Sequence, residues 1–324
     1  MSNTTEKTSN SLSLIRKEHR TKVLITLFLV TALAGGGYWA VVAATSSSAP
    51  PVALALRLAY IAVLYMPVPL YTLLLSRFML GIPIPFRALL SLKHITVKKY
   101  ALVAGLFLAW AVLMIGSVAV LGWLWPDTFG HLATTNGHLV HNLEKLIGTS
   151  VDTSAMNMPP TPLAMLPLGI FGALMAGLTV NAIFAMAEEI MWRGYLAQAF
   201  AGRPFCKKYV TIGVLWGLWH IPLIALGYNY GTANALPGSV LFIGFCVVMS
   251  LVLGFVVERT RSVWLAAVLH GTFNGFSQVM LLLVVGGSSL LASSAVGVVS
   301  LVAWLVVFVG CYISTAFASV TERV

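Results

Sequence analysis

The sequence predicts an all-α membrane protein, a polytopic bundle of about eight membrane-spanning helices with both termini in the cytoplasm. Three observations predict this class: the composition, the lengths of the apolar segments and the placement of the basic residues. Hydrophobic residues make up 59% of the 324 residues, charged residues only 9%, and the mean hydropathy is +0.93. A soluble domain has roughly 25% charged residues, so this chain has too few to cover a surface that faces water.

The apolar segments have the length that a lipid bilayer requires. A hydrocarbon core of roughly 30 Å is crossed by about 20 helical residues at 1.5 Å per residue. The spans must be helical, because an open strand would leave backbone groups without partners in lipid. Pro67 and Pro69 are expected to bend the second span, and Pro222 the fifth. The predicted spans are about residues 23–44, 52–76, 100–124, 162–187, 209–226, 237–257, 263–284 and 290–318.

The basic residues set the predicted orientation. All but two of the 19 lysine and arginine residues fall on one side of this topology, and the exceptions are Arg57 and Lys145. Basic residues are in excess in cytoplasmic loops, so that side and both termini are expected in the cytoplasm. We interpret the net charge of +10 as membrane topology and predict no nucleic-acid partner. The basic segment 77–99 is a candidate for contact with anionic lipid headgroups.

The predicted domain organisation has four parts. They are a polar basic tail at 1–22, an N-terminal transmembrane region at 23–160, a core at 162–284, and a last span with a short tail at 290–324. Residues 125–161 form a long external loop. Within it, Leu139, Leu143 and Leu146 share one helical face, which predicts a short interfacial helix.

Ionisable side chains at membrane depth gather in the core. The chain has nine acidic residues, and two of them, Glu188 and Glu189, are adjacent at the cytoplasmic end of the fourth predicted span. His220 lies in the fifth span and His270 in the seventh. Counted along their helices, these groups fall at a similar depth. Ionisable residues inside a membrane are costly and mark functional sites, so we predict one site built from three helices.

Residue spacing separates the expected roles of the two glutamates. Glu189 and Arg193 are four residues apart, share a helical face and can form an ion pair. Glu188 is rotated from Glu189 by about 100° around the helix, so the two carboxylates need not do the same work. Either a structural or a direct functional role fits the Glu189–Arg193 pair.

The remaining polar residues complete a set suited to hydrolysis. A glutamate in a low-dielectric site can act as a general base, and a histidine can share the proton transfer. His270 and Asn274 are four residues apart and can donate together to a developing oxyanion. Trp216 lies one turn before His220 and can shape its pocket. No GxSxG or HExxH motif occurs, so we predict peptide hydrolysis by an activated water.

Three sequence motifs resemble those of a known family. EEIMWRG (188–194), WGLWH (216–220) and WLAAVLHGTFN (264–274) are similar to the motifs EExxxR, FxxxH and HxxxN of the CPBP family. These are intramembrane glutamic endopeptidases, also called the Abi or type II CAAX prenyl endopeptidase family. The resemblance covers about residues 162–284. One departure is Trp216, where the family usually has Phe, and it predicts a reshaped pocket.

The resemblance implies a role for each matching residue. Glu188 would activate the catalytic water with help from His220, and His270 and Asn274 would stabilise the oxyanion. Glu189 and Arg193 would organise the site. The resemblance further implies a peptide or membrane-protein substrate, in CAAX-type processing or in peptide or bacteriocin maturation and immunity, at a prokaryotic cell membrane.

Two other classes of function remain open at this point. The first is a zinc-dependent membrane metalloendopeptidase with Glu188, His220 and His270 as ligands around an open position, a donor set that catalytic zinc accepts. The glutamic mechanism, in contrast, needs no metal or other cofactor. The second is a non-enzymatic membrane immunity or scaffold protein that keeps the polar core. The sequence also leaves the oligomeric state open.

Overall fold

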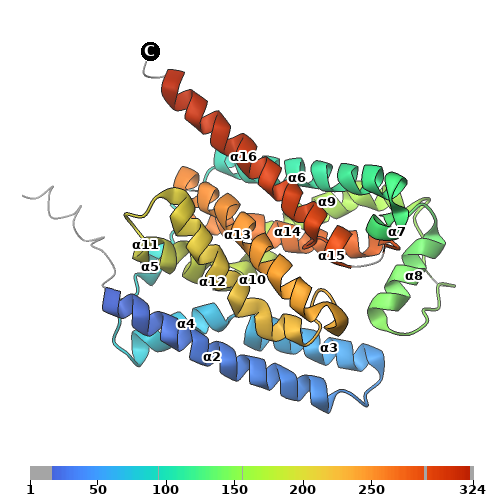
Figure 1. Ribbon diagram of the computed structural model, residues 1–324, viewed down its shortest axis with the longest axis horizontal. Coiled ribbons are helices and arrows are strands. Elements are labelled where there is room, and N and C mark those ends of the chain that lie inside the picture. The colour runs from blue at the N-terminus through green and yellow to red at the C-terminus, as the bar shows by residue number, and fades with distance from the viewer. Residues whose placement is uncertain (1–16, 94, 155, 288–289, 322–324) are drawn as a thin grey trace, which may run out of the picture.

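The computed structural model describes residues 17–93, 95–154, 156–287 and 290–321. Within these ranges the chain forms a bundle of long helices (Figure 1). Seven of the described helices are long and apolar enough to cross a membrane, and a further bent pair gives eight if it is one span. The predicted all-α polytopic bundle is therefore confirmed.

Each continuous membrane helix lies over one predicted apolar segment. These are α2 (Lys17–Ala44), α3 (Pro50–Tyr60) with η2 (Ile61–Tyr65) and α4 (Val68–Phe78), α6 (Val97–Leu124), α12 (Phe205–Ala225), η5 (Thr232–Asn234) with α13 (Ala235–Thr260), α14 (Val263–Leu283), and α15 (Leu290–Ser293) with α16 (Val298–Thr321). Residues 17–22 of the predicted tail are helical and extend α2. Residues 1–16 and 322–324 of the predicted tails lie outside the described residues.

The fourth predicted span is broken, which the sequence did not predict. The helices α9 (Met165–Leu178) and α10 (Val180–Glu189) meet at Thr179, and the two halves of the span are bent by 56°. After α10 the chain continues as a π-helix, η4 (Ile190–Leu196), and a short turn, α11 (Ala197–Ala199). In the second span the helix changes to the π-form η2 just before Pro67, where proline cannot donate its backbone N–H. The helix α12 continues past Pro222 to Ala225.

The long external loop is anchored to the bundle. It contains α7 (Pro126–Phe129) and α8 (Asn136–Ile147), and α8 is the short helix that the leucine spacing predicts. The short helix η3 (Pro162–Ala164) follows the loop, just before α9. The Asn142 side chain donates hydrogen bonds of 2.9 Å to the carbonyl oxygens of Leu282 and Val284. The strand β1 (His131–Leu132) pairs antiparallel with β2 (Val284–Val285). These contacts tie the loop to the end of α14.

Arg57, for which no role was predicted, lies in α3 and contacts the C-terminal end of α2. Its Nε atom donates to the Thr45 hydroxyl at 3.0 Å and its Nη2 atom to the Val42 carbonyl at 3.3 Å. A helix C-terminus carries partial negative charge and unpaired carbonyl groups. Arg57 therefore stabilises the turn between the first two spans.

Close packing of small residues holds the central helices together. Figure 1 shows α2, α3 and α4 along one side, α6 and α16 along the other, and α10, α12, α13 and α14 between them. A Cβ atom on Gly271 of α14 would lie 2.7 Å from the carbonyl carbon of Asn181 in α10. On Gly217 of α12, a Cβ atom would lie 2.6 Å from Cα of Ile243 in α13. Glycine at these two points lets the helices that carry the polar residues approach closely.

Candidate active site

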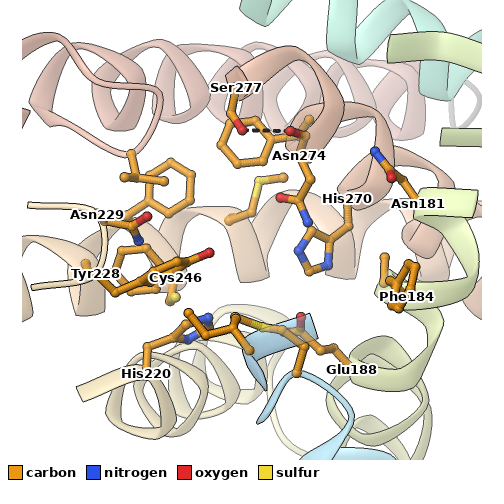
Figure 2. A pocket seen from close by; sticks show the side chains of 18 of the residues that line it. Asn181, Phe184, Glu188, His220, Tyr228, Asn229, Cys246, His270, Asn274 and Ser277 are labelled. Carbon is orange, nitrogen blue, oxygen red and sulfur yellow. Dashed lines mark hydrogen bonds between the residues drawn. The ribbon is translucent and has the colours of Figure 1, made fainter. Parts of the chain in front are cut away.

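A cavity of about 350 Å³ lies among the central helices. Glu188, His220, His270 and Asn274 all line it, although they come from α10, α12 and α14. Glu188 and His220 lie on one side of the cavity, and His270 and Asn274 on the other (Figure 2). The structure therefore brings together the four residues that the sequence predicts as catalytic.

The two glutamates end α10 and have different partners. Glu188 is 4% exposed, and its Oε2 atom accepts a hydrogen bond of 2.9 Å from the indole Nε1 of Trp216. Glu189 is fully buried and has no place in the lining of the cavity. This arrangement follows from the 100° rotation between adjacent helical residues. Glu188 is the carboxylate available to a substrate, and Glu189 is the one held by the protein.

Glu189 joins two basic side chains. Its Oε1 atom lies 2.9 Å from Nη1 of Arg193 and 3.0 Å from Nδ1 of His270. The pair with Arg193 is the one that the spacing predicts, whereas the contact with His270 was not predicted. A carboxylate only accepts hydrogen bonds, so Nδ1 of His270 carries a proton here. The second ring nitrogen, Nε2, is left for the cavity.

Trp216 is the centre of this network. The guanidinium carbon of Arg193 lies 4.3 Å from the centre of its ring, a cation–π contact. The His270 ring packs edge-on against it, with ring centres 5.3 Å apart. Together with the hydrogen bond to Glu188, these contacts give Trp216 more than the pocket-shaping role that the sequence predicts. A phenylalanine at this position would lack the N–H donor.

His220 is fixed by its own helix. Its Nδ1 atom lies 3.0 Å from the carbonyl oxygen of Trp216, one turn earlier. A carbonyl oxygen only accepts hydrogen bonds, so Nδ1 carries the proton and Nε2 has a free lone pair. The ring packs between Trp219 and Phe242, with ring centres 4.4 and 4.6 Å away. His220 can therefore accept a proton from a bound water.

Three further residues of the cavity were missed in the sequence. Asn181 donates a hydrogen bond of 3.1 Å to the Gly271 carbonyl and ties α10 to α14. Asn181 lies seven residues before Glu188, so the two residues share one helical face. This spacing could have identified Asn181 as a residue of the site. Tyr228 and Cys246 also line the cavity. Burial, with a smaller contribution from the Glu188 carboxylate, raises the pKa of the Tyr228 hydroxyl to about 12, so this group stays a hydrogen-bond donor.

The π-helix η4 begins directly after the two glutamates. All seven of its residues, Ile190–Leu196, are buried. A π-turn places one extra residue in the helix and is frequent at functional sites. Arg193 lies within this turn and still reaches Glu189. The sequence predicted a regular helix here, because a π-turn has no distinctive apolar period.

The zinc alternative requires Glu188, His220 and His270 to converge on one point. Their donor atoms suit catalytic zinc. Nevertheless, nowhere in the described part of the chain are three or more His, Cys, Asp or Glu side chains grouped to hold a metal ion. In both histidines Nδ1 is engaged by the protein, which leaves only Nε2 to coordinate. The side chains as placed do not form a zinc site.

A comparison with protein families singles out the same part of the chain. Residues 162–276 match the family model described as type II CAAX prenyl endopeptidase Rce1-like. A CAAX prenyl protease 2 of Methanococcus maripaludis is 28% identical over 95 residues. This match covers 28% of the present chain and 35% of the relative, so it spans about a third of that protein. All seven predicted site residues fall within residues 162–276.

Proposed function

We propose that this multi-pass membrane protein, which matches the type II CAAX prenyl endopeptidase family model through residues 162–276, is an intramembrane endopeptidase of the glutamic type. The match supports a protease of the CAAX type at the family level. The assignment of residues and mechanism to this chain is our proposal.

One observation carries the proposal. Glu188, His220, His270 and Asn274 line a single cavity, although they come from three separate helices. We assign the general base to Glu188, the proton acceptor to His220, and the oxyanion donors to His270 and Asn274. Among the described residues, the buried Glu188 carboxylate accepts one hydrogen bond, from Trp216, and so retains acceptor capacity for a water molecule. Its neighbour Glu189 is occupied with Arg193 and His270. Glu188 is therefore the carboxylate that we assign to the chemistry.

In the first step, a water molecule binds between Glu188 and His220. The Glu188 carboxylate takes a proton from this water, and Nε2 of His220 accepts a hydrogen bond from it. The water oxygen then forms a bond to the carbon of the scissile carbonyl, and the carbonyl π-electrons move to its oxygen. General-base catalysis of this kind contributes roughly 10²–10⁴-fold to a rate.

In the second step, the tetrahedral intermediate collapses. Nε2 of a protonated His270 and the amide of Asn274 donate hydrogen bonds to the oxyanion, and the Glu189 carboxylate offsets the charge of that imidazolium. Protonated Glu188 gives its proton to the leaving nitrogen as the C–N bond breaks. The products are a carboxylic acid and an amine, and the mechanism uses no cofactor.

The proposed substrate is a peptide or a membrane protein. The relative in Methanococcus maripaludis is named for prenylated CAAX proteins, and we extend that substrate class to this chain as one candidate. Maturation of a peptide or bacteriocin, with self-immunity, is the other candidate. With either class of substrate, we propose that an extended peptide binds in the cavity, which the side chains of Tyr228 and Asn181 also line.

The purified protein in proteoliposomes can test this function. We expect it to hydrolyse peptides from a defined mixture that contains prenylated and unprenylated CAAX sequences, each product pair gaining one water by mass. His220→Ala should be inactive while unfolding at the same temperature as the wild type. Cleavage of the prenylated peptides alone would identify the CAAX class. Equal cleavage by wild type and His220→Ala would contradict the proposal.

A further inference from the structure

The segment between α4 and α6 forms a basic groove on the surface. Its short helix α5 (Phe86–Leu89) follows an irregular segment that contains Pro83 and Pro85. Arg77, Arg87, Lys93 and Ser91 line the groove, whose volume is about 610 Å³. None of the described residues that line it is acidic.

The positive charge of this groove is not compensated by the protein. The ion pairs of the described residues join Lys22, Arg193, Lys208 and His270 to glutamates, and none involves the three basic residues of the groove. Arg77, Arg87 and Lys93 are all exposed. Three uncompensated cations around one groove favour an anionic ligand.

Apolar side chains flank the groove. Phe78 is 79% exposed, Met79 75%, Leu92 60% and Val97 85%. Side chains of this kind are covered by acyl chains at a membrane surface, and basic residues beside them lie at the level of the headgroups. The two features together favour a phospholipid over a soluble anion.

The groove is connected to the candidate active site. Leu89 is buried, and a Cβ atom on Gly194 of η4 would lie 3.1 Å from its Cδ2 atom. Trp264, at the start of α14, donates a hydrogen bond of 3.0 Å to the Leu90 carbonyl. The helix α5 packs against η4. The segment therefore supports both the helix of Arg193 and the helix of His270.

We propose that the groove of Arg77, Arg87 and Lys93 binds the headgroup of an anionic phospholipid. The phosphate lies among the three cations, and the acyl chains lie on Phe78, Met79 and the other exposed apolar residues. The bound lipid holds residues 82–91 against η4 and the start of α14. This inference concerns binding and is independent of the proposed protease activity.

A lipid titration of the full-length protein in detergent tests the proposal, with the thermal unfolding midpoint as the readout. Phosphatidylglycerol should raise the midpoint, whereas phosphatidylcholine and inorganic phosphate should not. Each basic residue near an anionic lipid contributes roughly a fivefold change in affinity. Arg77→Gln/Arg87→Gln/Lys93→Gln should therefore shift half-maximal stabilisation to lipid concentrations on the order of 100-fold higher.

The matched control also removes three positive charges, but from residues outside the groove. Lys17→Gln/Lys207→Gln/Arg259→Gln changes three exposed basic residues outside the groove and should keep the wild-type lipid response. An equal loss in both triple variants would overturn the proposal, as would stabilisation by phosphatidylcholine or by an acidic soluble peptide in place of phosphatidylglycerol. Hydrogen exchange on the wild type gives a second measurement: phosphatidylglycerol should slow exchange in residues 82–91, and unchanged exchange would overturn the proposal.

Discussion

The indole Nε1 of Trp216 lies 2.9 Å from Oε2 of Glu188, and this hydrogen bond links the second sequence motif to the first. The same ring lies under the Arg193 guanidinium and beside the His270 ring. A tryptophan at this position therefore orients the proposed base and also contacts the pair that supports His270. A phenylalanine at this position would keep an aromatic ring but would lack the N–H that donates to Glu188.

Trp216→Phe keeps an aromatic ring and removes the donor to Glu188. A hydrogen bond to a charged group contributes about 1.5–3 kcal/mol, so we expect kcat to fall by roughly 10- to 100-fold. KM should change little, because the bond orients the base and does not bind the substrate. Steady-state kinetics on a cleaved peptide measure both constants.

Trp219→Phe is the matched control for that variant. The Nε1 atom of Trp219 is buried and has no hydrogen-bond partner among the described residues, while its ring also packs on a histidine of the site. Its replacement should reduce kcat much less. An equal loss in the two variants would mean that ring volume, and not the hydrogen bond, sets the effect of Trp216.

The adjacent glutamates should respond differently to the same substitution. Glu189→Gln leaves the Arg193 charge buried without its partner, which costs roughly 3–5 kcal/mol of stability. We expect a lower unfolding temperature in detergent and less accumulated protein. Glu188→Gln can still accept the Trp216 N–H and should unfold like the wild type, but without activity. Normal stability of Glu189→Gln would contradict the supporting role of this ion pair.

Asn274→Ala tests the proposed oxyanion donor. Loss of one such donor typically costs about 10²–10³ in kcat, and we expect a decrease of this size. Ser277→Ala is its control, because Ser277 lies one turn away in the same cavity and donates only to the Asn274 backbone carbonyl. If both variants keep full kcat, the oxyanion role assigned to Asn274 is wrong.

Gly271→Ala tests how closely α10 and α14 must approach. The added Cβ atom would meet the Asn181 backbone at 2.7 Å, so the helices must separate next to His270. We expect lower thermal stability and lower activity together. Gly116→Ala in α6 is the control, because no described atom beyond the neighbouring residues and backbone of its own helix lies within 4 Å of the added carbon. It should be neutral or slightly stabilising. A stable, active Gly271→Ala would show that this packing is not required.

Metal removal separates the glutamic mechanism from the zinc alternative. After dialysis of the purified protein against a strong zinc chelator, we expect unchanged cleavage of a peptide substrate. Loss of activity that zinc restores, and that chelator-free dialysis does not cause, would instead favour Glu188, His220 and His270 as ligands. Metal analysis of the protein before and after dialysis completes the measurement.

The sequence predicted the spans because apolar length and charge depletion are direct consequences of the bilayer. It also predicted that Glu188, His220 and His270 meet, because depth along each helix follows from residue counts. The break at Thr179 and the π-turn after Glu189 were not predicted, since neither changes the apolar pattern. The contacts of Trp216 with Glu188 and of Glu189 with His270 depend on how three helices rotate against each other, which spacing within one helix does not determine.

The most direct test of the central claim compares the membrane peptides and protein termini of cells that make the wild type with those of cells that make Glu188→Gln. Both proteins should accumulate to the same level. We predict that a defined set of new termini, produced by peptide-bond hydrolysis, occurs with the wild type and is absent with Glu188→Gln. The same termini at the same abundance in both cell lines would contradict the assignment of Glu188 as the catalytic base.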